Sequence, residues 1–364
     1  MKKGVRNKVV FVLGAGFVAP AHGPQQSELL DLILKRPISP LLREFFVRVF
    51  HAHTARQRSM IRIEDVFTVL DRAIGWQENV RGLSPHQADE LRISLVRDLV
   101  RELNARLHAP PRPYMKLAKR LAQIRIESGT DRDPFSFISF NWDMLFDLAL
   151  HRCCLDLEAK PPLQVDYCCF HYALEKQSRR TLNTTQQVAG RLHLKLLRLH
   201  GSTHWLVCPQ CAKLFVWFQH QARHLASPCL FCREAPPLQP LLITPTLLKD
   251  LQSIQLKTVW HNALTELQEA AHLVFVGYSL PLADFEFRYL LAKSVSPDAR
   301  ITVITSPSGI GPTPNPPIHC EPVFDTADHI QMRYASLFGN RKIEYSTMGA
   351  EGFLDTDPEL WMSR

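Results

Sequence analysis

The sequence contains no run that approaches the roughly 20 apolar residues needed for a membrane-spanning helix. Its first apolar run, Val9 to Leu13, is too short for the core of a secretory signal and lacks a small-residue cleavage site. We therefore expect no membrane span and no targeting signal, and we expect a cytoplasmic protein. Internal repeats are also missing.

Charge of one sign is only in modest excess. There are 43 basic and 35 acidic residues, which give a formal net charge of +8. This bias favours phosphorylated ligands or nucleic acid without choosing between them. Apolar residues make up 46% of the chain, which argues against wholesale disorder, and 364 residues can bury one large core or two modest ones.

Four of the nine cysteines form two Cys-x-x-Cys pairs, Cys208 with Cys211 and Cys229 with Cys232. In a reducing compartment, paired thiols hold metal more often than they form disulfides. Two such pairs separated by a loop of 17 residues, 212–228, predict a tetrahedral zinc site. A site closed by four thiolates leaves no open coordination position, so we expect the zinc to be structural.

Other interpretations of the cysteines stay open. The two pairs could be unrelated, and the adjacent cysteines Cys153-Cys154 and Cys168-Cys169, like Cys320, are expected as buried thiols because neighbouring residues cannot both chelate one ion easily. The loop between the zinc pairs contains the apolar run 214–218, which is more typical of packing than of phosphate binding. Nucleic-acid binding is therefore only a minor hypothesis.

Short apolar runs that alternate with helical patterns predict an α/β fold with a parallel sheet and crossover helices. The expected strands are Val9–Leu13, Phe135–Phe140, Leu194–Leu199, Leu241–Thr244, Leu273–Gly277 and Ile301–Ile304. Helical spacing of apolar residues dominates from Ser27 to about Ile126 and again from Leu247 to Ala270.

A glycine loop comes directly after the first expected strand. Gly14-x-Gly16-x-x-Ala19 fits a loose dinucleotide fingerprint, in which small residues let the backbone approach a pyrophosphate. The fingerprint is weak alone, because Pro20 and Pro24 oppose an immediate crossover helix and no acidic residue is present at the expected distance. An ordinary strand-to-turn glycine pair is the alternative.

The order of several motifs resembles the sirtuin series across about residues 9 to 305. The motifs are Gly14-Ala15-Gly16 with Gly23-Pro24, Ser139-Phe140-Asn141-Trp142-Asp143, His200-Gly201-Ser202 before Cys208, and Gly277-Tyr278-Ser279-Leu280. A closer likeness is to the divergent bacterial sirtuin-like domains of NAD-consuming defence proteins. It involves Ile63-Glu64-Asp65, Asp166-Tyr167-Cys168, Trp205, Ile243-Thr244-Pro245-Thr246, and Pro281 with Asp284.

The resemblance implies a Rossmann-type fold with inserted helical and zinc modules. The expected division is a NAD-binding core at 1–26, 127–207 and 236–330, a helical insertion at 27–126, a zinc ribbon at 208–235 and a C-terminal tail at 331–364. It further implies hydrolysis of NAD to nicotinamide and ADP-ribose, and a role in bacterial anti-phage defence. A homo-oligomer and a partner protein of such a system are compatible with it.

Site residues are assigned from chemistry and from the resemblance together. Asn141 can orient water or the nicotinamide ribose, and His200 can take a proton from water or a ribose hydroxyl. By resemblance, Asp143 fixes the nicotinamide carboxamide or holds its loop. NAD contacts are expected from Gly14, Ala15, Gly16, Gly277, Ser279 and Thr305. Each has an ordinary alternative: Asn-x-Asp can be a helix cap, and a histidine can be a surface or core residue.

Two departures from the sirtuin pattern bear on the reaction. Val18 stands where deacylating sirtuins usually place a serine, and Ile243-Thr244-Pro245 replaces the segment that pairs with an acyl-lysine peptide. These changes oppose protein deacylation more than NAD binding. A sensor or scaffold that binds NAD or ADP-ribose without turnover remains the main alternative to hydrolysis.

Overall fold

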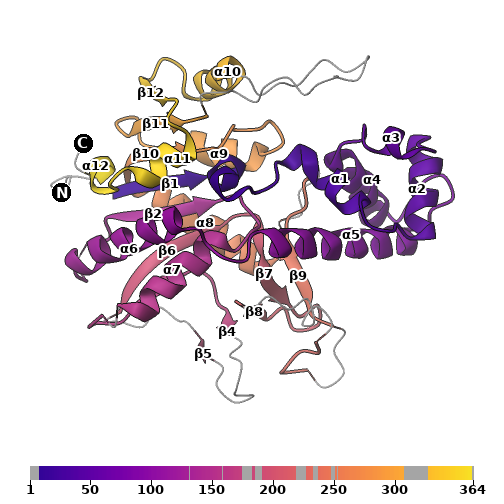
Figure 1. The fold of residues 1–364 in the computed structure, drawn as a ribbon, viewed down its shortest axis with the longest axis horizontal. Helices are drawn as coiled ribbons and strands as arrows, with labels where there is room; N and C mark the ends of the chain where they lie inside the picture. The colour runs from indigo at the N-terminus through magenta and orange to yellow at the C-terminus, as the bar shows by residue number, and fades with distance from the viewer. Residues whose placement is uncertain are drawn as a thin grey trace.

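The computed structural model describes residues 8–130, 132–157, 159–173, 183–184, 191–218, 227–232, 237–246, 251, 253–306 and 327–362. Two sheets organise these residues, a larger parallel one and a smaller mostly antiparallel one (Figure 1). None of the helices in these ranges combines the length and the apolar character needed to cross a membrane.

The larger sheet has seven strands in the order β12-β11-β10-β1-β2-β6-β3, and neighbouring strands run parallel. The strands are β1 (Lys8–Leu13), β2 (Phe135–Ser139), β3 (Leu163–Asp166), β6 (Leu192–Arg198), β10 (Ala270–Val276), β11 (Arg300–Ile304) and β12 (Ile343–Ser346). Every residue of β1 and β2 is buried. Continuous burial without alternation is what a parallel sheet covered on both faces requires. The expected α/β class is confirmed.

Two groups of helices cover this sheet. One group consists of α6 (Arg112–Glu127), α7 (Leu145–Asp156), α11 (Gly349–Asp355) and α12 (Glu359–Met362), and the other of α8 (Ile254–Glu269), α9 (Phe285–Ser294) and α10 (Ala327–Phe338). Helix α6 contacts α7 and α11, whereas α8 contacts α9, and α9 contacts α10. The helix expected at 247–270 is observed as α8, which begins at Ile254 and ends at Glu269. Residues 247–250 and 252 lie outside the described ranges.

A helical module is inserted between β1 and α6. It contains α1 (Leu29–Leu34), α2 (Pro40–Phe50), α3 (Ala55–Arg58), α4 (Ile63–Trp76) and α5 (Pro85–Arg106), preceded by the short 3-10 helices η1 (Ala15–Ala21) and η2 (Gln26–Glu28). In Figure 1, α1 to α4 gather at the end of the long helix α5 that lies away from the sheet. Because α6 packs on α7 and β6, it belongs to the core and not to the insertion expected at 27–126.

Local sequence explains the start of α5. Ser84 caps the helix in a reciprocal capping box with Gln87, and Pro85 occupies the first helical position.

Helix α4 joins the helical module to the residues that follow β9 of the smaller sheet. Asp71 on α4 accepts hydrogen bonds from Arg92 Nε at 2.6 Å and from Thr244 Oγ1 at 3.3 Å.

The smaller sheet has the order β5-β4-β8-β7-β9. Its strands are β4 (Tyr172–Ala173), β5 (Asn183–Thr184), β7 (Gly201–Val207), β8 (Leu214–Val216) and β9 (Gln239–Leu242). The apolar run at 241–244 was expected in the parallel sheet, and this prediction is wrong, because β9 pairs antiparallel with β7. A short buried run predicts a strand but carries no information about which sheet it joins.

The C-terminal residues also differ from expectation. Residues 331–364 were expected as a tail, but β12 pairs parallel with β11, and Trp361 in α12 is buried. The polar composition has a simple cause: β12 is an edge strand whose middle residues, Glu344 and Tyr345, are exposed. An edge strand with exposed residues is therefore easily mistaken for irregular polar chain.

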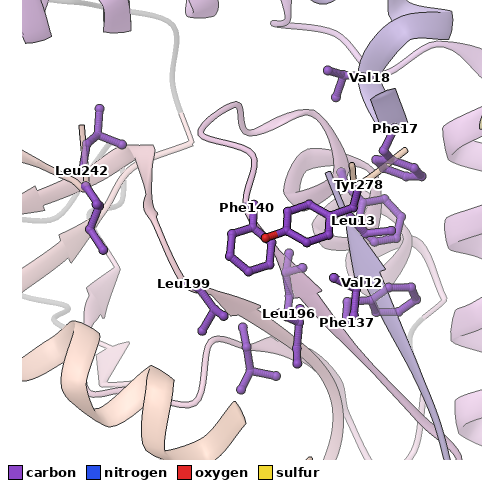
Figure 2. Packing of buried hydrophobic residues seen from close by; sticks show 14 of the residues in the cluster. Val12, Leu13, Phe17, Val18, Phe137, Phe140, Leu196, Leu199, Leu242 and Tyr278 are labelled. Carbon is purple, nitrogen blue, oxygen red and sulfur yellow. The ribbon is translucent and has the colours of Figure 1, made fainter. Parts of the chain in front are cut away.

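Aromatic packing joins these layers into one core. Phe11 on β1 stacks on Phe137 of β2 with ring centroids 5.1 Å apart, and Phe353 from α11 meets Phe11 edge-on at 5.7 Å. Phe140 and Tyr278, from the ends of β2 and β10, lie side by side near the tips of these strands (Figure 2). The core thus extends up to the carboxyl edge of the sheet.

Candidate functional site

The residues predicted for catalysis and for NAD contacts all lie just beyond the carboxyl ends of five neighbouring strands. Register places one residue of each strand in a single row across the sheet: Ile304, Val276, Leu13, Ser139 and Arg198. The predicted residues come directly after this row: Thr305 after β11, Gly277 and Ser279 after β10, Gly14 to Gly16 after β1, Asn141 and Asp143 after β2, and His200 after β6. The sheet grows from β1 in both directions, and ligands of open α/β sheets bind at such a switch point.

Gly14, Gly16 and Gly277 pack directly against one another. The Gly14 N–H donates to Val276 O at 3.0 Å, and the Gly16 N–H donates to Gly277 O at 2.9 Å. A Cβ on Gly16 would lie 2.8 Å from Gly277 Cα, and Gly277 itself has a φ of 58°. Close approach of the β1 and β10 loops therefore already requires these glycines, whether or not a pyrophosphate is bound.

The segment after Gly14 forms the 3-10 helix η1, with Pro20 inside it. The prediction that Pro20 opposes an immediate α-helix at this point is confirmed. Ala15 is exposed and Gly16 is half-buried, so this loop borders the outer side of the edge. Strand β1 therefore does not lead into a long helix whose N-terminus could bind a phosphate.

A fully buried ion pair anchors the neighbouring loop. Arg198 at the end of β6 is 1% exposed, and its guanidinium pairs with Asp147 of α7, whose side chain is 0% exposed. Arg198 also donates to Asn141 O at 2.7 Å and to Ser139 Oγ at 3.3 Å. Burial lowers the pKa of Arg198 to about 10, although the nearby Asp143 carboxylate opposes this shift. The pair thus fixes the backbone from which Asn141 projects.

Asn141 and Asp143 occupy this loop in different ways. Asp143 is buried, and its Oδ1 accepts the Leu145 N–H at 3.0 Å in the first turn of α7. Burial raises the pKa of Asp143, with Arg198 and the Leu145 N–H acting in the opposite direction. Asp143 therefore bonds within its own loop, but it does not cap α7, whose N-cap is Met144 and has no side-chain hydrogen bond. Asn141 is 9% exposed, and within the described part of the chain its side-chain amide has no hydrogen-bond partner.

His200 lies beside this loop at the end of β6 and is 7% exposed. Its Nε2 is 3.5 Å from Asp284 Oδ1, and its ring meets Phe140 edge-on with centroids 4.9 Å apart. Its carbonyl oxygen accepts the Ile243 N–H at 3.0 Å. The structure thus brings His200 to the same edge as Asn141, although 59 positions separate them in the sequence.

A second histidine, His204, belongs to a closed network. Its Nδ1 lies 2.8 Å from Ser202 Oγ, and its Nε2 lies 3.1 Å from Tyr167 Oη and 3.5 Å from Asp147 Oδ1. Burial, with help from Arg198, lowers the pKa of His204 well below its usual value. The contacts resemble those of a nucleophilic triad, but Ser202 is 0% exposed and donates to Trp142 O. This network is structural.

The four predicted zinc ligands lie together. All four sulfurs of Cys208, Cys211, Cys229 and Cys232 are within 4.8 Å of one another. The Cys211 and Cys229 sulfurs are 3.7 Å apart. Thiolates held tetrahedrally about 2.3 Å from zinc are separated by about 3.8 Å, so the spacing fits a shared ion and is far too long for a disulfide.

The first knuckle is shaped by its backbone. Cys208 donates its N–H to Lys213 O at 3.0 Å, and Ala212 donates its N–H to Cys208 O at 2.9 Å.

The other described cysteines are free thiols, and burial raises the pKa of each; they are Cys153, Cys154, Cys168 and Cys169. Cys153, Cys168 and Cys169 are buried, as expected, whereas Cys154 is only half-buried and Cys320 lies outside the described ranges.

Sequence reasoning missed the roles of Asp147 and Arg198 and left Asp284 without one. A signal existed for the first two: Arg198 interrupts a run of leucines at the end of a buried strand, and Asp147 sits in an apolar helix. Charged residues in such positions are rarely buried unless they are paired. Nothing in the sequence indicates which acidic residue is the partner.

The zinc site predicts that purified protein contains about one zinc per chain. Cys232→Ser should remove the zinc and lower the melting temperature, because binding to a structural site contributes directly to folding. Cys154→Ser should keep the zinc. Elemental analysis and thermal unfolding measure both, and a folded wild-type protein without zinc would contradict the assignment.

The buried pair predicts a large loss of stability in Asp147→Ala. Removing one partner leaves the Arg198 charge buried and unpaired, a change that costs about 3–5 kcal/mol in the free energy of unfolding. Asp98→Ala serves as the control, because Asp98 pairs with Arg101 near the surface and such pairs contribute about 0–1 kcal/mol. Urea unfolding of both variants decides, and equal losses would refute the anchoring role.

The glycine contact predicts that Gly16→Ala lowers the free energy of unfolding by about 1–3 kcal/mol through overpacking against Gly277. Gly75→Ala in α4 is the matched control, since a Cβ there meets nothing within 4 Å. This control should stabilise the helix by up to about 1 kcal/mol. If Gly16→Ala unfolds like wild type while NAD affinity falls, the glycine serves the ligand alone.

No protein-family model matches the chain, and no curated protein matches it. Comparison with solved structures finds Sir2 proteins. Sir2Tm bound to a propionylated peptide is 12% identical, with 95% of this chain and 90% of that chain covered at a TM-score of 0.40. A Sir2 homologue in complex with NAD is 13% identical, with coverage of 91% and 90% and a TM-score of 0.41.

Proposed function

We propose that this protein hydrolyses NAD to nicotinamide and ADP-ribose at the carboxyl edge of the parallel sheet. The observation that carries the proposal is the register of β2 and β6. Ser139 pairs with Arg198, so Asn141 and His200 stand at matching positions, two residues beyond neighbouring strands. An amide and an imidazole that follow neighbouring strands, at the same edge of the sheet as the glycine loops of β1 and β10, supply the groups that cleavage of a nicotinamide riboside bond needs.

The chemistry assigns each group a task. Departure of nicotinamide leaves positive, oxocarbenium-like charge on the ribose, and water adds to the same carbon with loss of one proton. The Asn141 amide orients the water or the ribose, and the His200 imidazole takes the proton. Ser279 and Thr305, which are both half-buried, are the expected contacts to the phosphate and the adenosine ribose.

Asp143 enters the proposal as a residue that holds the loop. Its carboxylate is bonded to the Leu145 N–H, so a direct contact with the nicotinamide carboxamide would share that oxygen or use the other one. Arg198 is neutralised by Asp147 and serves the same loop. Neither charged group is proposed to contact the reacting carbon.

Binding of NAD or ADP-ribose without turnover is the second candidate function. One observation favours it: Asn141 and His200 are only 9% and 7% exposed, so NAD reaches them only if the surrounding side chains move. While these two groups are shielded, NAD bound at the glycine loops would not be turned over. An activating ligand or an assembly step would convert the one function into the other.

Protein deacylation is opposed by the environment of Ile243. In the segment that replaces the peptide-pairing motif, the Ile243 N–H donates to His200 O, and Ile243 O accepts the Trp142 indole N–H at 3.1 Å. Thr244 O accepts the Thr246 N–H at 2.8 Å. Main-chain groups already used inside the protein are not available to pair with a substrate strand. A role in bacterial anti-phage defence rests on the sequence resemblance alone.

The proposal predicts that Asn141→Ala and His200→Ala each reduce NAD hydrolysis by at least about a hundredfold, a typical general-base contribution. NAD affinity should fall much less. The double variant should be scarcely worse than the weaker single one, since groups that act as a unit are not additive. Purified protein is incubated with NAD, and nicotinamide, ADP-ribose and any cyclic product are quantified.

His86→Ala is the matched control, because the His86 side chain is 84% exposed in the first turn of α5, a helix of the inserted module. It should hydrolyse NAD at the wild-type rate. Near-normal turnover in both single variants would remove Asn141 and His200 from the reaction. Calorimetric binding of NAD without any product, in wild type, would select the sensor function.

A further inference from the structure

Asp284 is the last residue of the loop between β10 and α9, and its carboxylate lies between the Tyr278 hydroxyl and the His200 ring. Its Oδ2 accepts the Tyr278 hydroxyl at 2.6 Å, and its Oδ1 lies 3.5 Å from His200 Nε2. The side chains of His200 and Asp284 are 9% and 8% exposed, so this contact is shielded from water. A carboxylate and an imidazole held together in such surroundings interact far more strongly than a surface pair does.

The carboxylate is held from several sides. The Asp284 N–H donates to Pro281 O at 3.1 Å, and its carbonyl oxygen accepts the Phe287 and Arg288 N–H groups at 3.1 and 3.0 Å. These bonds fix its backbone at the first turn of α9. The Tyr278 hydroxyl then fixes the side chain, leaving Oδ1 on the His200 side.

Tyr278 is itself firmly placed. Its ring stacks on Phe140 at 4.5 Å, a contact visible in Figure 2, and its carbonyl oxygen accepts the Tyr334 hydroxyl from α10 at 2.8 Å. Burial and the Asp284 carboxylate raise the pKa of Tyr278 well above its usual value, so its hydroxyl remains a donor. Phe140 also meets the His200 ring edge-on, so one aromatic residue contacts both ends of the Tyr278–Asp284–His200 series.

We propose that Asp284 is the positioning residue for His200. Its carboxylate faces Nε2, holds the tautomer that carries hydrogen on Nε2, and so places the proton-accepting lone pair on Nδ1. It also stabilises the imidazolium that forms when His200 takes a proton. Tyr278 orients Asp284 in turn. The inference rests on the proposed function for its consequence in catalysis, but the tautomer is a property of the protein without substrate.

Other charged groups near this series do not replace the carboxylate. Arg288 on α9 donates through Nη1 to Leu280 O at 3.4 Å, and its positive charge acts on Tyr278. Arg288 carries donors and no acceptor, so it cannot accept the hydrogen of His200 Nε2 in place of the carboxylate. Ile243, which donates its N–H to the His200 carbonyl oxygen, is uncharged.

The test compares Asp284→Asn with Asp298→Asn. Asp298 lies in an exposed loop after α9 and provides a matched loss of one carboxylate. Asp284→Asn should lower kcat for NAD hydrolysis about a hundredfold and leave KM within about threefold, because the asparagine keeps the shape but not the charge. Tyr278→Phe should give a smaller loss, and Asp298→Asn none.

Nitrogen-15 NMR of the His200 ring supplies a readout that is independent of activity, with the signal identified by its absence in His200→Gln. Wild type at neutral pH should show hydrogen on Nε2, and Asp284→Asn should shift the ring nitrogens toward a mixture of tautomers. A wild-type ring with hydrogen on Nδ1 alone overturns the inference even if Asp284→Asn does not fold. If wild type does not hydrolyse NAD, the proposed function fails, and the NMR measurement still decides the role of Asp284. If wild type hydrolyses NAD and Asp284→Asn keeps the same kcat as Asp298→Asn, only the positioning role of Asp284 fails.

Discussion

The buried pair of Arg198 and Asp147 is the interaction on which the candidate site depends. It joins the end of β6 to α7, and through the Arg198 contacts to Ser139 and Asn141 it also joins both to the loop after β2. Taking two charges out of water is costly, and the attraction between them offsets this only when further hydrogen bonds satisfy both groups. Asp147 obtains such a bond from the Tyr167 hydroxyl at 2.9 Å. A hydrophobic pair would fill the space but would not hold the Asn141 backbone.

The glycine loops illustrate a different constraint. Gly14 and Gly16 match a pyrophosphate-binding pattern, yet their neighbours in the structure are Gly277 and Tyr278. The same absence of a side chain would serve a ligand and a neighbouring loop equally well, so the pattern alone does not decide between them. The packing does establish that the loops after β1 and β10 are in direct contact, with no room for a Cβ at Gly14, Gly16 or Gly277.

Much of the parallel sheet could be predicted from sequence, because strands buried on both faces are continuous apolar runs. The strands at 9–13, 135–140, 194–199, 273–277 and 301–304 were found in this way. Two strands show the limit. β9 is equally apolar but joins the other sheet, and β12 is too polar to be noticed because it lies at an edge. Pairing partners depend on long-range register, which no local pattern contains.

The candidate site shows the same difference between local patterns, which could be predicted from the sequence, and long-range contacts, which could not. The four zinc cysteines could be predicted because their spacing is local, and Asn141 and His200 could be named because they come after strands in a known motif order. Asp284 could not be assigned to His200, since 84 positions separate them and the contact arises only when the N-terminus of α9 comes to the residues that follow β6. Tyr167 and His204 likewise meet only in the fold.

Strand β7 has a consequence for how metal dependence would be interpreted. It begins directly after His200 and ends directly before Cys208, so a single extended segment of seven residues, about 23 Å long, connects the two centres. Removal of a zinc ion from the four cysteines would free the Val207 end of β7 and so increase the motion of His200 at the other end. A chelator would then lower the proposed activity, although the four cysteines lie at the opposite end of β7 from His200. Inhibition of this kind would report lost rigidity, and a catalytic metal would be the wrong conclusion.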